Sequence, residues 1–272
     1  MRHGEVRNYE RLSPLGRTPH WAAFTAKAED GSLVELRLFD ESLAAADVRR
    51  IFRRMQLVVI IQHPGVRSIL EVAESHQPLF AVVELLTGES LSRRQQHSPV
   101  TPAETLQLGM QLSEAMAEAH RFGINTGVLS TDVIVERHRG EWTIDLSHAV
   151  NPHSGSSSAM SPERRTEFSE KLDAERDVVA LAWLLRKLAS SHPVDPSKDG
   201  PQVFERLDRA CQLAEEQPVS AGEFAKRLRA VHDTIVASGG ACLSGTVAPE
   251  TDFPYTNATL VGKQAGGRSG IV

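Results

Sequence analysis

Two short segments, GINTGVLSTDVIV at Gly123–Val135 and IDLSHA at Ile144–Ala149, decide the interpretation of this sequence. The first segment has valine at two positions, Val128 and Val133, and the second contains an aspartate, Asp145. A valine side chain has no atom that accepts a proton or ligates magnesium, whereas a carboxylate can do both. Of these three side chains, only that of Asp145 can therefore accept a proton or ligate a metal ion.

Length, charge and cysteine content restrict the class of protein. The chain has 272 residues and a formal net charge of -5, which is enough length for one bilobal domain or two ordinary ones. A negative net charge gives no global basic field, so we expect no nucleic-acid partner. Cys211 and Cys242 lie far apart and form no metal or disulfide pattern, which favours a reduced, cytoplasmic setting. No run reaches the roughly 18 apolar residues of a membrane span, and no apolar signal core follows Met1.

The first part of the chain has the alternation of short strands. Turn signals such as Asp30-Gly31 and Pro64-Gly65 interrupt it, and Ala44–Gln62 has helical periodicity. We therefore expect a small antiparallel sheet packed against one helix. The expected strands are Tyr9–Leu15, Trp21–Ala28, Leu33–Phe39, Ser68–Ala73 and Phe80–Leu86.

Helical periodicity dominates from Thr101 onward. Pro102 stands where helices often begin, and apolar residues recur at helical spacing as far as Ala119. Further helices are expected at Asp177–Leu188, Val203–Glu215 and Ala221–Ile235. The sequence thus predicts an α+β, bilobal domain over residues 1–236, with a first lobe at about 9–86 and a second at about 90–236. Residues 237–272 are rich in Gly, Ser, Thr and Ala, and we expect a flexible tail there.

Short motifs in a fixed order connect these elements, and each is weak alone. They are Leu15-Gly16, Val34-Glu35-Leu36-Arg37, His63-Pro64-Gly65-Val66, Val83-Glu84 with Gly88-Glu89-Ser90-Leu91, the two segments quoted above, Ser161-Pro162-Glu163, and Asp173-Ala174-Glu175-Arg176-Asp177. Together, from Tyr9 to His232, they resemble the bacterial serine/threonine protein kinases. The resemblance implies a kinase-like fold, with a small antiparallel β lobe carrying one helix and a larger helical lobe. The alternative is an unrelated α+β protein with chance matches.

The resemblance also implies where a nucleotide would bind. It places Gly16–Trp21 at the glycine-rich loop that cradles phosphates. Pro19 removes a backbone donor there, and Trp21 puts an indole where a glycine belongs. We expect Trp21 to fill the vacated pocket as a core residue. The tentative nucleotide contacts that remain are Arg37, Glu84, Leu86 and Asp145.

The charged pair of the nucleotide site is altered as well. Arg37 stands for the lysine that pairs with phosphates, and Arg54 stands at about the position of that lysine's glutamate partner. Two cations cannot form this ion pair, and a guanidinium is a different donor array from an ammonium. Glu35 would place a carboxylate beside the adenine, which is costly to bury. An ion pair between Arg37 and Asp145 is the expected arrangement.

The same resemblance assigns the positions of catalysis. Val128 stands for the catalytic aspartate and Val133 for the metal-binding asparagine, so no catalytic residue and no magnesium site are expected. Asp132 is the nearest alternative base, but it lies on the wrong side of the loop. Asp177 matches the aspartate that holds the catalytic loop through backbone hydrogen bonds, and we expect it to keep this role.

Two surface features suggest binding. Four arginines of the first-lobe helix place like charges at i,i+4, which costs helix stability unless an anion or acidic partner is near. The alternative is a solvated face screened by salt. These binding candidates are Arg49, Arg50, Arg53 and Arg54. The tail resembles phospho-acceptor segments that recruit phosphothreonine-reading domains, with candidates Thr246, Thr251, Thr256 and Thr259.

Three functions follow from these observations. The first is a catalytically inactive kinase homologue, a pseudokinase, that serves as a signalling scaffold or regulatory binding protein with protein partners such as an active kinase. The second is a weakly active or unconventional serine/threonine kinase that binds ATP. The third is an adaptor phosphorylated on its tail by an active kinase. We expect no cofactor for the first function, whereas weak binding of ATP or another nucleotide stays open.

Overall fold

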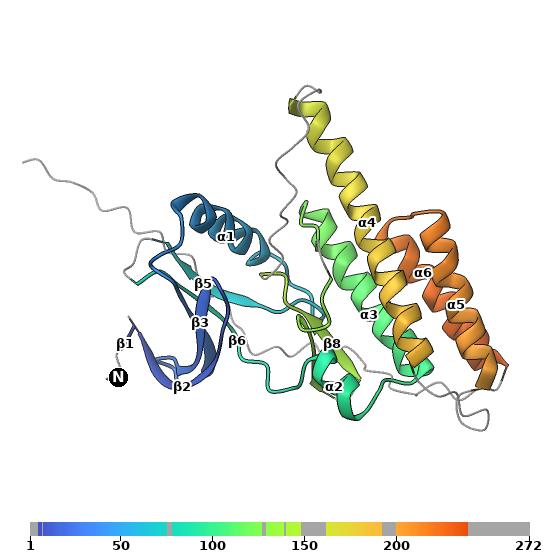
Figure 1. The fold of residues 1–272 in the computed structure, drawn as a ribbon, viewed down its shortest axis with the longest axis horizontal. Helices are drawn as coiled ribbons and strands as arrows, with labels where there is room; N and C mark the ends of the chain where they lie inside the picture. Colours follow the sequence, from blue (N-terminus) through green and yellow to red (C-terminus); the bar gives the residue numbers. More distant parts are fainter. Residues whose placement is uncertain are drawn as a thin grey trace, which may run out of the picture.

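The computed structural model describes residues 5–6, 8–74, 78–126, 129–138, 140–147, 162–191 and 200–238. It has an α+β architecture in which an antiparallel sheet comes first and helices follow (Figure 1). The first elements are β1 (Glu5–Val6), β2 (Tyr9–Arg17), β3 (Trp21–Lys27), β4 (Leu33–Phe39), α1 (Ala45–Val58), β5 (Ile69–Ala73) and β6 (Phe80–Glu84). They are followed by α2 (Leu91–His97), α3 (Pro102–Arg121), β7 (Ile134–His138), β8 (Glu141–Ile144), α4 (Pro162–Ser191), α5 (Gly200–Glu216) and α6 (Ala221–Ala237).

The sheet has six strands in the order β1-β2-β3-β4-β6-β5, and every pairing is antiparallel. Strand β6 lies inside the sheet and is buried on both faces, which explains its nearly unbroken apolar run. Its side chains alternate between two cores: Ala81 and Val83 join the large core under α1, whereas Phe80 and Val82 join a smaller core on the other face. Every second residue of β6 therefore faces the large core, which continues into the second lobe.

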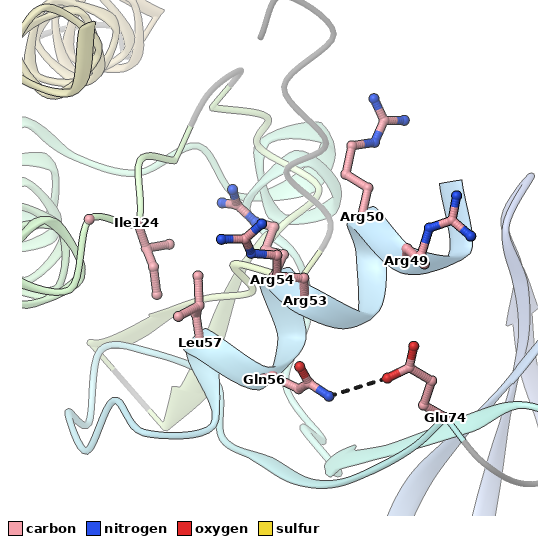
Figure 2. A pocket seen from close by; sticks show the side chains of 9 residues that line it. Arg49, Arg50, Arg53, Arg54, Gln56, Leu57, Glu74 and Ile124 are labelled. Atoms are coloured by element: carbon pink, nitrogen blue, oxygen red, sulfur yellow. Dashed lines mark hydrogen bonds between the residues drawn. The ribbon is translucent and has the colours of Figure 1, made fainter. Parts of the chain in front are cut away.

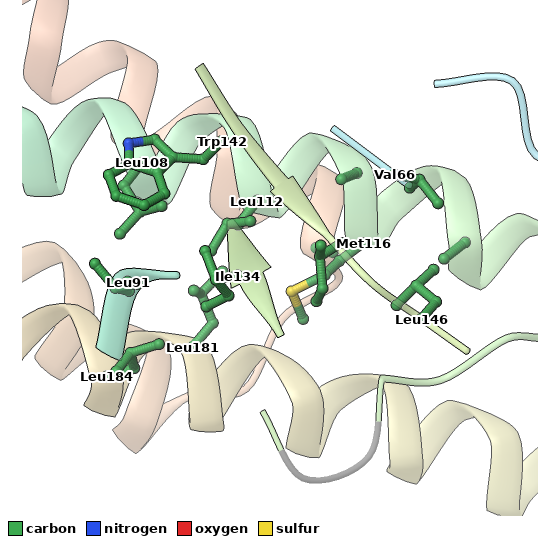
Figure 3. Packing of buried hydrophobic residues seen from close by; sticks show 14 of the residues in the cluster. Val66, Leu91, Leu108, Leu112, Met116, Ile134, Trp142, Leu146, Leu181 and Leu184 are labelled. Atoms are coloured by element: carbon green, nitrogen blue, oxygen red, sulfur yellow. The ribbon is translucent and has the colours of Figure 1, made fainter. Parts of the chain in front are cut away.

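Helix α3 is the centre of the second lobe. Thr101 caps its first turn in a capping box with Glu104, and Pro102 occupies the position where the missing N–H costs nothing. Its apolar face packs against α4, α5, α6 and the β7–β8 hairpin. Figure 3 shows this core, with the hairpin residue Ile134 between α3 and α4.

The segment that connects the two lobes packs closely against β7. A Cβ atom added to Gly88 would stand 1.4 Å from the carbonyl oxygen of Glu136, so no larger residue fits without a backbone shift. The N–H of Glu136 donates to the carbonyl of Glu89 at 3.0 Å, and Ser90 forms an isolated bridge with Val135. The joint is thus fastened to the second lobe by backbone contacts.

The structure agrees with the predicted strands and corrects one helix. Helix α1 ends at Val58, somewhat earlier than expected, and α2 and the β7–β8 hairpin were not predicted. Helix α4 begins at Pro162, not at Asp177, because the residues between them are mostly strong helix formers and Pro162 suits a first turn. Asp177 therefore lies in the middle of a 30-residue helix. Among the described residues, no helix combines the length and apolarity that a membrane crossing requires.

Candidate functional site

The candidate site lies where the sheet meets the end of β8. Strand β4 brings Glu35 and Arg37 to one face because they are two residues apart. The backbone of Arg67 donates to the carbonyl of Ile144 at 2.9 Å, which holds Arg67 beside the end of β8. Asp145 follows directly, and its N–H donates to the carbonyl of Val133 at 2.8 Å. Residues far apart in the sequence thus converge here.

Four of these side chains form a closed ring of ion pairs, which we call the charged ring: Glu35, Arg37, Arg67 and Asp145. Arg37 donates from Nε to Glu35 at 2.7 Å and from Nη2 to Asp145 at 2.5 Å. Arg67 completes the ring by donating from Nη1 to Asp145 at 2.9 Å and from Nη2 to Glu35 at 2.7 Å. The formal charges of the ring sum to zero. Arg37 is fully buried, so this balance is what allows its charge to remain in the interior.

The pKa shifts in the ring follow from this pairing. Burial alone would raise the pKa of Glu35, but Arg37 and Arg67 outweigh it and hold that pKa below its ordinary value. Burial would lower the pKa of Arg37, and the carboxylates of Asp145 and Glu35 instead raise it. Both shifts favour the charged forms of Glu35 and Arg37, as expected for groups that pair with opposite charges.

The expected ion pair between Arg37 and Asp145 is present, and it removes Asp145 as a metal ligand. Oδ2 of Asp145 accepts from Arg37 and Arg67. Oδ1 accepts from the N–H of Ser147 at 3.0 Å and also from its hydroxyl. Since a carboxylate oxygen has two lone pairs, these four bonds use the acceptor capacity of Asp145. The side chains around Asp145 do not fit a magnesium ion.

Glu84, another of the tentative nucleotide contacts, already has hydrogen-bond partners. The backbone carbonyl of Glu84 accepts from Nε of Arg67 at 3.0 Å and from its Nη2 at 2.6 Å. The Glu84 carboxylate pairs with Arg137 at 2.8 Å. Leu86 is partly buried in the connection after β6. Because Arg67 reaches both this carbonyl and Asp145, its side chain spans the region where the resemblance places the nucleotide.

The turn between β2 and β3 has no spare donors for phosphate. The N–H of Thr18 donates to the carbonyl of Trp21 at 2.9 Å. The N–H groups of His20 and Trp21 donate to the Thr18 hydroxyl at 3.2 and 3.1 Å, and Pro19 has no N–H. The backbone N–H groups of residues 18–21 are therefore bonded within the turn, unlike the free N–H groups of a phosphate-binding loop.

Trp21 is a core residue, as expected. Its side chain is 2% exposed, and its ring centroid lies 5.6 Å from that of Phe39. The guanidinium carbon of Arg37 lies 5.1 Å from the Trp21 ring centroid, which adds a cation–π contact to the charged ring. The indole thus covers one side of the ring.

The catalytic-loop positions have structural roles where they are described. Val133 is partly buried and packs against the large core, and Val128 lies outside the described residues. Asp177 accepts a hydrogen bond from the N–H of Thr126 at 2.5 Å, as expected, and also contacts His120 Nε2 at 3.0 Å. Asp132 is exposed. The support of the loop is present, while Val133 supplies only packing and a carbonyl.

Arg54 connects the first-lobe helix to the second lobe. Its Nε donates to the carbonyl of Leu146 at 2.8 Å, and its Nη2 donates to the carbonyl of Asn125 at 2.6 Å. Burial lowers the pKa of Arg54 to about 10, with a partly opposing effect from Asp177. An arginine at a glutamate position thus joins the lobes through backbone carbonyls instead of an ion pair.

The arginines of α1 also line a cavity of about 720 Å³, which we call the arginine groove. Figure 2 shows Arg49 and Arg50 on the first half of the helix, with Arg53 and Arg54 on the next turn. The second lobe contributes Gly123 and Ile124, and the remaining lining residues are Gln56, Leu57 and Glu74. The tail threonines Thr246, Thr251, Thr256 and Thr259 lie outside the described residues.

Arg67 is the functional residue that the sequence analysis missed. It contacts residues at positions 35, 84 and 145, so no local pattern marks it. The pair Glu35 and Arg37 did carry a signal, because i,i+2 residues of a strand share a face. The sequence analysis therefore named Glu35, Arg37 and Asp145 of the ring, and it missed Arg67.

Comparison with known proteins gives a distant similarity. No family model matches the chain. The chain is 25% identical over 236 residues to serine/threonine-protein kinase pkn2 of Myxococcus xanthus. The similarity covers 71% of this chain and 28% of the kinase, so the chain spans less than a third of that protein's length. Together with the α+β architecture, this distant similarity is consistent with a kinase-like protein.

Proposed function

We propose that this chain is a bilobal kinase-like protein without phosphoryl transfer, a pseudokinase that acts as a signalling scaffold or regulatory binding protein. The observation that carries the proposal is the charged ring, in which Arg37, Arg67 and Ser147 use the acceptor capacity of Asp145. Phosphoryl transfer depends on metal ions and positioned groups that neutralise developing charge. An aspartate that is already saturated does not supply that function.

The loss of a base compounds this effect. A positioned general base contributes about 10²–10⁴-fold to a rate, and a valine at position 128 cannot act as one. Val133 offers no side-chain oxygen for a second metal ion. The proposal therefore gives the fold a binding role and not a catalytic one.

The ring has a second consequence for such a protein. Glu35, Arg37 and Arg67 belong to the first lobe, and Asp145 belongs to the second, so the ring joins the lobes. A kinase-like chain whose lobes are held by buried ion pairs presents a fixed surface to a protein partner. The partners of this proposal are proteins, such as an active kinase or a phosphothreonine-reading domain. A reduced, cytoplasmic setting accompanies it, and the buried Cys211, whose burial raises its thiol pKa to about 12, is compatible with that setting.

A thermal-shift experiment tests the proposal directly. The chain is melted with ATP, ADP and a non-hydrolysable ATP analogue, each with and without magnesium. We expect no change in Tm, because ligand binding to the folded state alone raises Tm. A saturable rise of several degrees with Mg-ATP would count against the proposal.

A labelling experiment examines the active-kinase alternative. The chain is incubated with γ-labelled ATP and magnesium, alone and with a general protein substrate, and Asp145→Asn is the control variant. We expect no label above background in either protein. Label that disappears in the Asp145→Asn variant would establish activity, whereas label that the variant retains would indicate a contaminating kinase.

A further inference from the structure

The arginine groove has the volume of a small ligand site and is lined by residues of both lobes. Its volume of about 720 Å³ lies in the range of ligand sites, about 300–1,000 Å³. One wall is α1 of the first lobe, and Gly123 and Ile124 of the second lobe complete it. The groove is therefore a place where both lobes contact the same ligand.

Positive charge in the groove exceeds the negative charge that faces it. Arg50 pairs with Asp47 at 2.9 Å, and both side chains are about half exposed. Glu74 contacts the Gln56 amide at 3.4 Å. Arg49 and Arg53 are exposed and make no hydrogen bond or ion pair with any residue that the structure describes. The like charges of Arg49 and Arg53 at i,i+4 therefore have no counter-charge bonded to them among the described residues.

Arg54 adds a guanidinium that is buried without a carboxylate bound to it. Its Nε and Nη2 donate to two neutral carbonyls, and its Nη1 has no hydrogen bond to a described residue. Burial lowers the pKa of Arg54 to about 10, and the Asp177 carboxylate, which is not bonded to Arg54, opposes this shift only in part. An anion in the groove would supply the missing counter-charge.

The groove also has an apolar side. Leu57 is 41% exposed, and Figure 2 shows it pointing toward Ile124 across the groove. A free phosphate ion would make no use of this side, whereas a peptide can place an apolar side chain there beside its charged group. Nucleic acid is a poorer match because the described residues that line the groove include no aromatic side chain for base stacking, and the whole chain has a net negative charge.

We propose that the arginine groove binds a protein segment that carries a phosphorylated side chain next to an apolar residue. A phosphate group carries about -1.5 to -2 charges at neutral pH and accepts several charge-assisted hydrogen bonds from guanidinium forks. Arg49 and Arg53 supply such forks, Arg54 adds its Nη1, and Leu57 with Ile124 receives the apolar side chain. This inference rests on the proposed binding function, and it names the chemistry of the partner.

The experiment uses the full chain without ATP or magnesium. Binding is measured to a peptide library with phosphothreonine or phosphoserine fixed at its centre, and to the same library without phosphate. We expect about tenfold or greater preference for the phosphorylated library, since charge-assisted hydrogen bonds are lost with the phosphate. The binding should weaken as salt is raised.

The test variant is Arg49→Glu combined with Arg53→Glu. Its matched control is Arg206→Glu combined with Arg209→Glu, which makes the same charge change on exposed positions of α5. We expect the groove variant to lose phosphopeptide binding at least tenfold and the α5 variant to keep it. Urea denaturation of both variants verifies that they are folded.

Four results would overturn the inference. They are equal binding of phosphorylated and unphosphorylated peptides, unchanged binding in the groove variant, inorganic phosphate as strong a ligand as the phosphopeptides, and a 16-nucleotide single strand that binds more tightly. The nucleotide thermal shift is measured separately on the same variants. A positive thermal shift with intact phosphopeptide binding would contradict the proposed function alone, and the reverse pattern would contradict this inference alone.

Discussion

The charged ring and the arginine groove both contain arginines, but the ring neutralises their charge with carboxylates, whereas the groove leaves it exposed to solvent. In the ring, Arg37 and Arg67 each contact both carboxylates, and all four residues are mostly removed from solvent. In the groove, Arg49 and Arg53 are exposed and have no carboxylate within reach among the described residues. Buried charge must be neutralised internally, whereas exposed charge can be left for a ligand.

This difference indicates a structural role for the arginines of the ring and a binding role for those of the groove. The site that the resemblance assigns to ATP is filled by paired side chains, so its arginines hold the lobes together. The arginines that are not neutralised internally, Arg49 and Arg53, lie on α1, where solvent and a partner can reach them. Arg54 is intermediate, because it is partly buried and its partners are neutral carbonyls. Replacing arginine by methionine at Arg67 of the ring, at the intermediate Arg54 and at Arg53 of the groove tests this comparison.

Arg67→Met should have the largest effect. It leaves Glu35 and Asp145 buried with one arginine between them and frees the carbonyl of Glu84. Breaking a buried ion pair by removing one partner costs about 3–5 kcal/mol, so we expect a loss of that size in the free energy of unfolding. Urea denaturation followed by circular dichroism measures it.

The control for this variant is Arg67→Lys, which keeps the charge but cannot donate as a fork to three acceptors at once. We expect its loss to be smaller than that of Arg67→Met. A loss under about 1 kcal/mol for Arg67→Met would mean that the ring is not what holds the lobes together.

Arg54→Met should have an intermediate effect. It removes two hydrogen bonds to the carbonyls of Leu146 and Asn125 without leaving a carboxylate unpaired. Unsatisfied buried acceptors cost about 1–3 kcal/mol, and that is the expected loss in the free energy of unfolding. Hydrogen exchange provides a second measurement, because the segments around residues 125 and 146 should exchange faster. An effect as large as that of Arg67→Met would place Arg54 with the ring.

Arg53→Met should have the smallest effect on stability. The Arg53 side chain is exposed, and its removal relieves one like-charge contact at i,i+4 with Arg49. We expect a change within about 0.5 kcal/mol in the free energy of unfolding, with phosphopeptide binding reduced. A large destabilisation with unchanged peptide binding would show that the groove arginines are structural, and the contrast with the ring would fail.

Local patterns predicted much of the fold. Strand β4 was expected at Leu33–Phe39 and is found there, because its alternation reflects one face toward each core. The start of α4 was missed, since apolar periodicity indicated a helix from Asp177 while the residues after Pro162 are themselves helix formers. Trp21 was correctly expected in the core.

The candidate site was predictable only where its chemistry is local. The pairing of Glu35 with Arg37 follows from strand geometry, and the pairing of Arg37 with Asp145 followed from the resemblance. The partners of Arg54 could not be predicted, because every residue has a backbone carbonyl and the sequence does not mark which one an arginine reaches. The same holds for Arg67 and the carbonyl of Glu84.

The sequence by itself determined the types of most elements, and it determined that Val128 supplies no acidic group and Val133 no amide. Periodicity and side-chain chemistry are properties of the chain read in order. The tertiary structure decided which arginines are neutralised and which are left exposed. That outcome depends on distances between residues that are far apart in the sequence, and on how deeply each charge is removed from water.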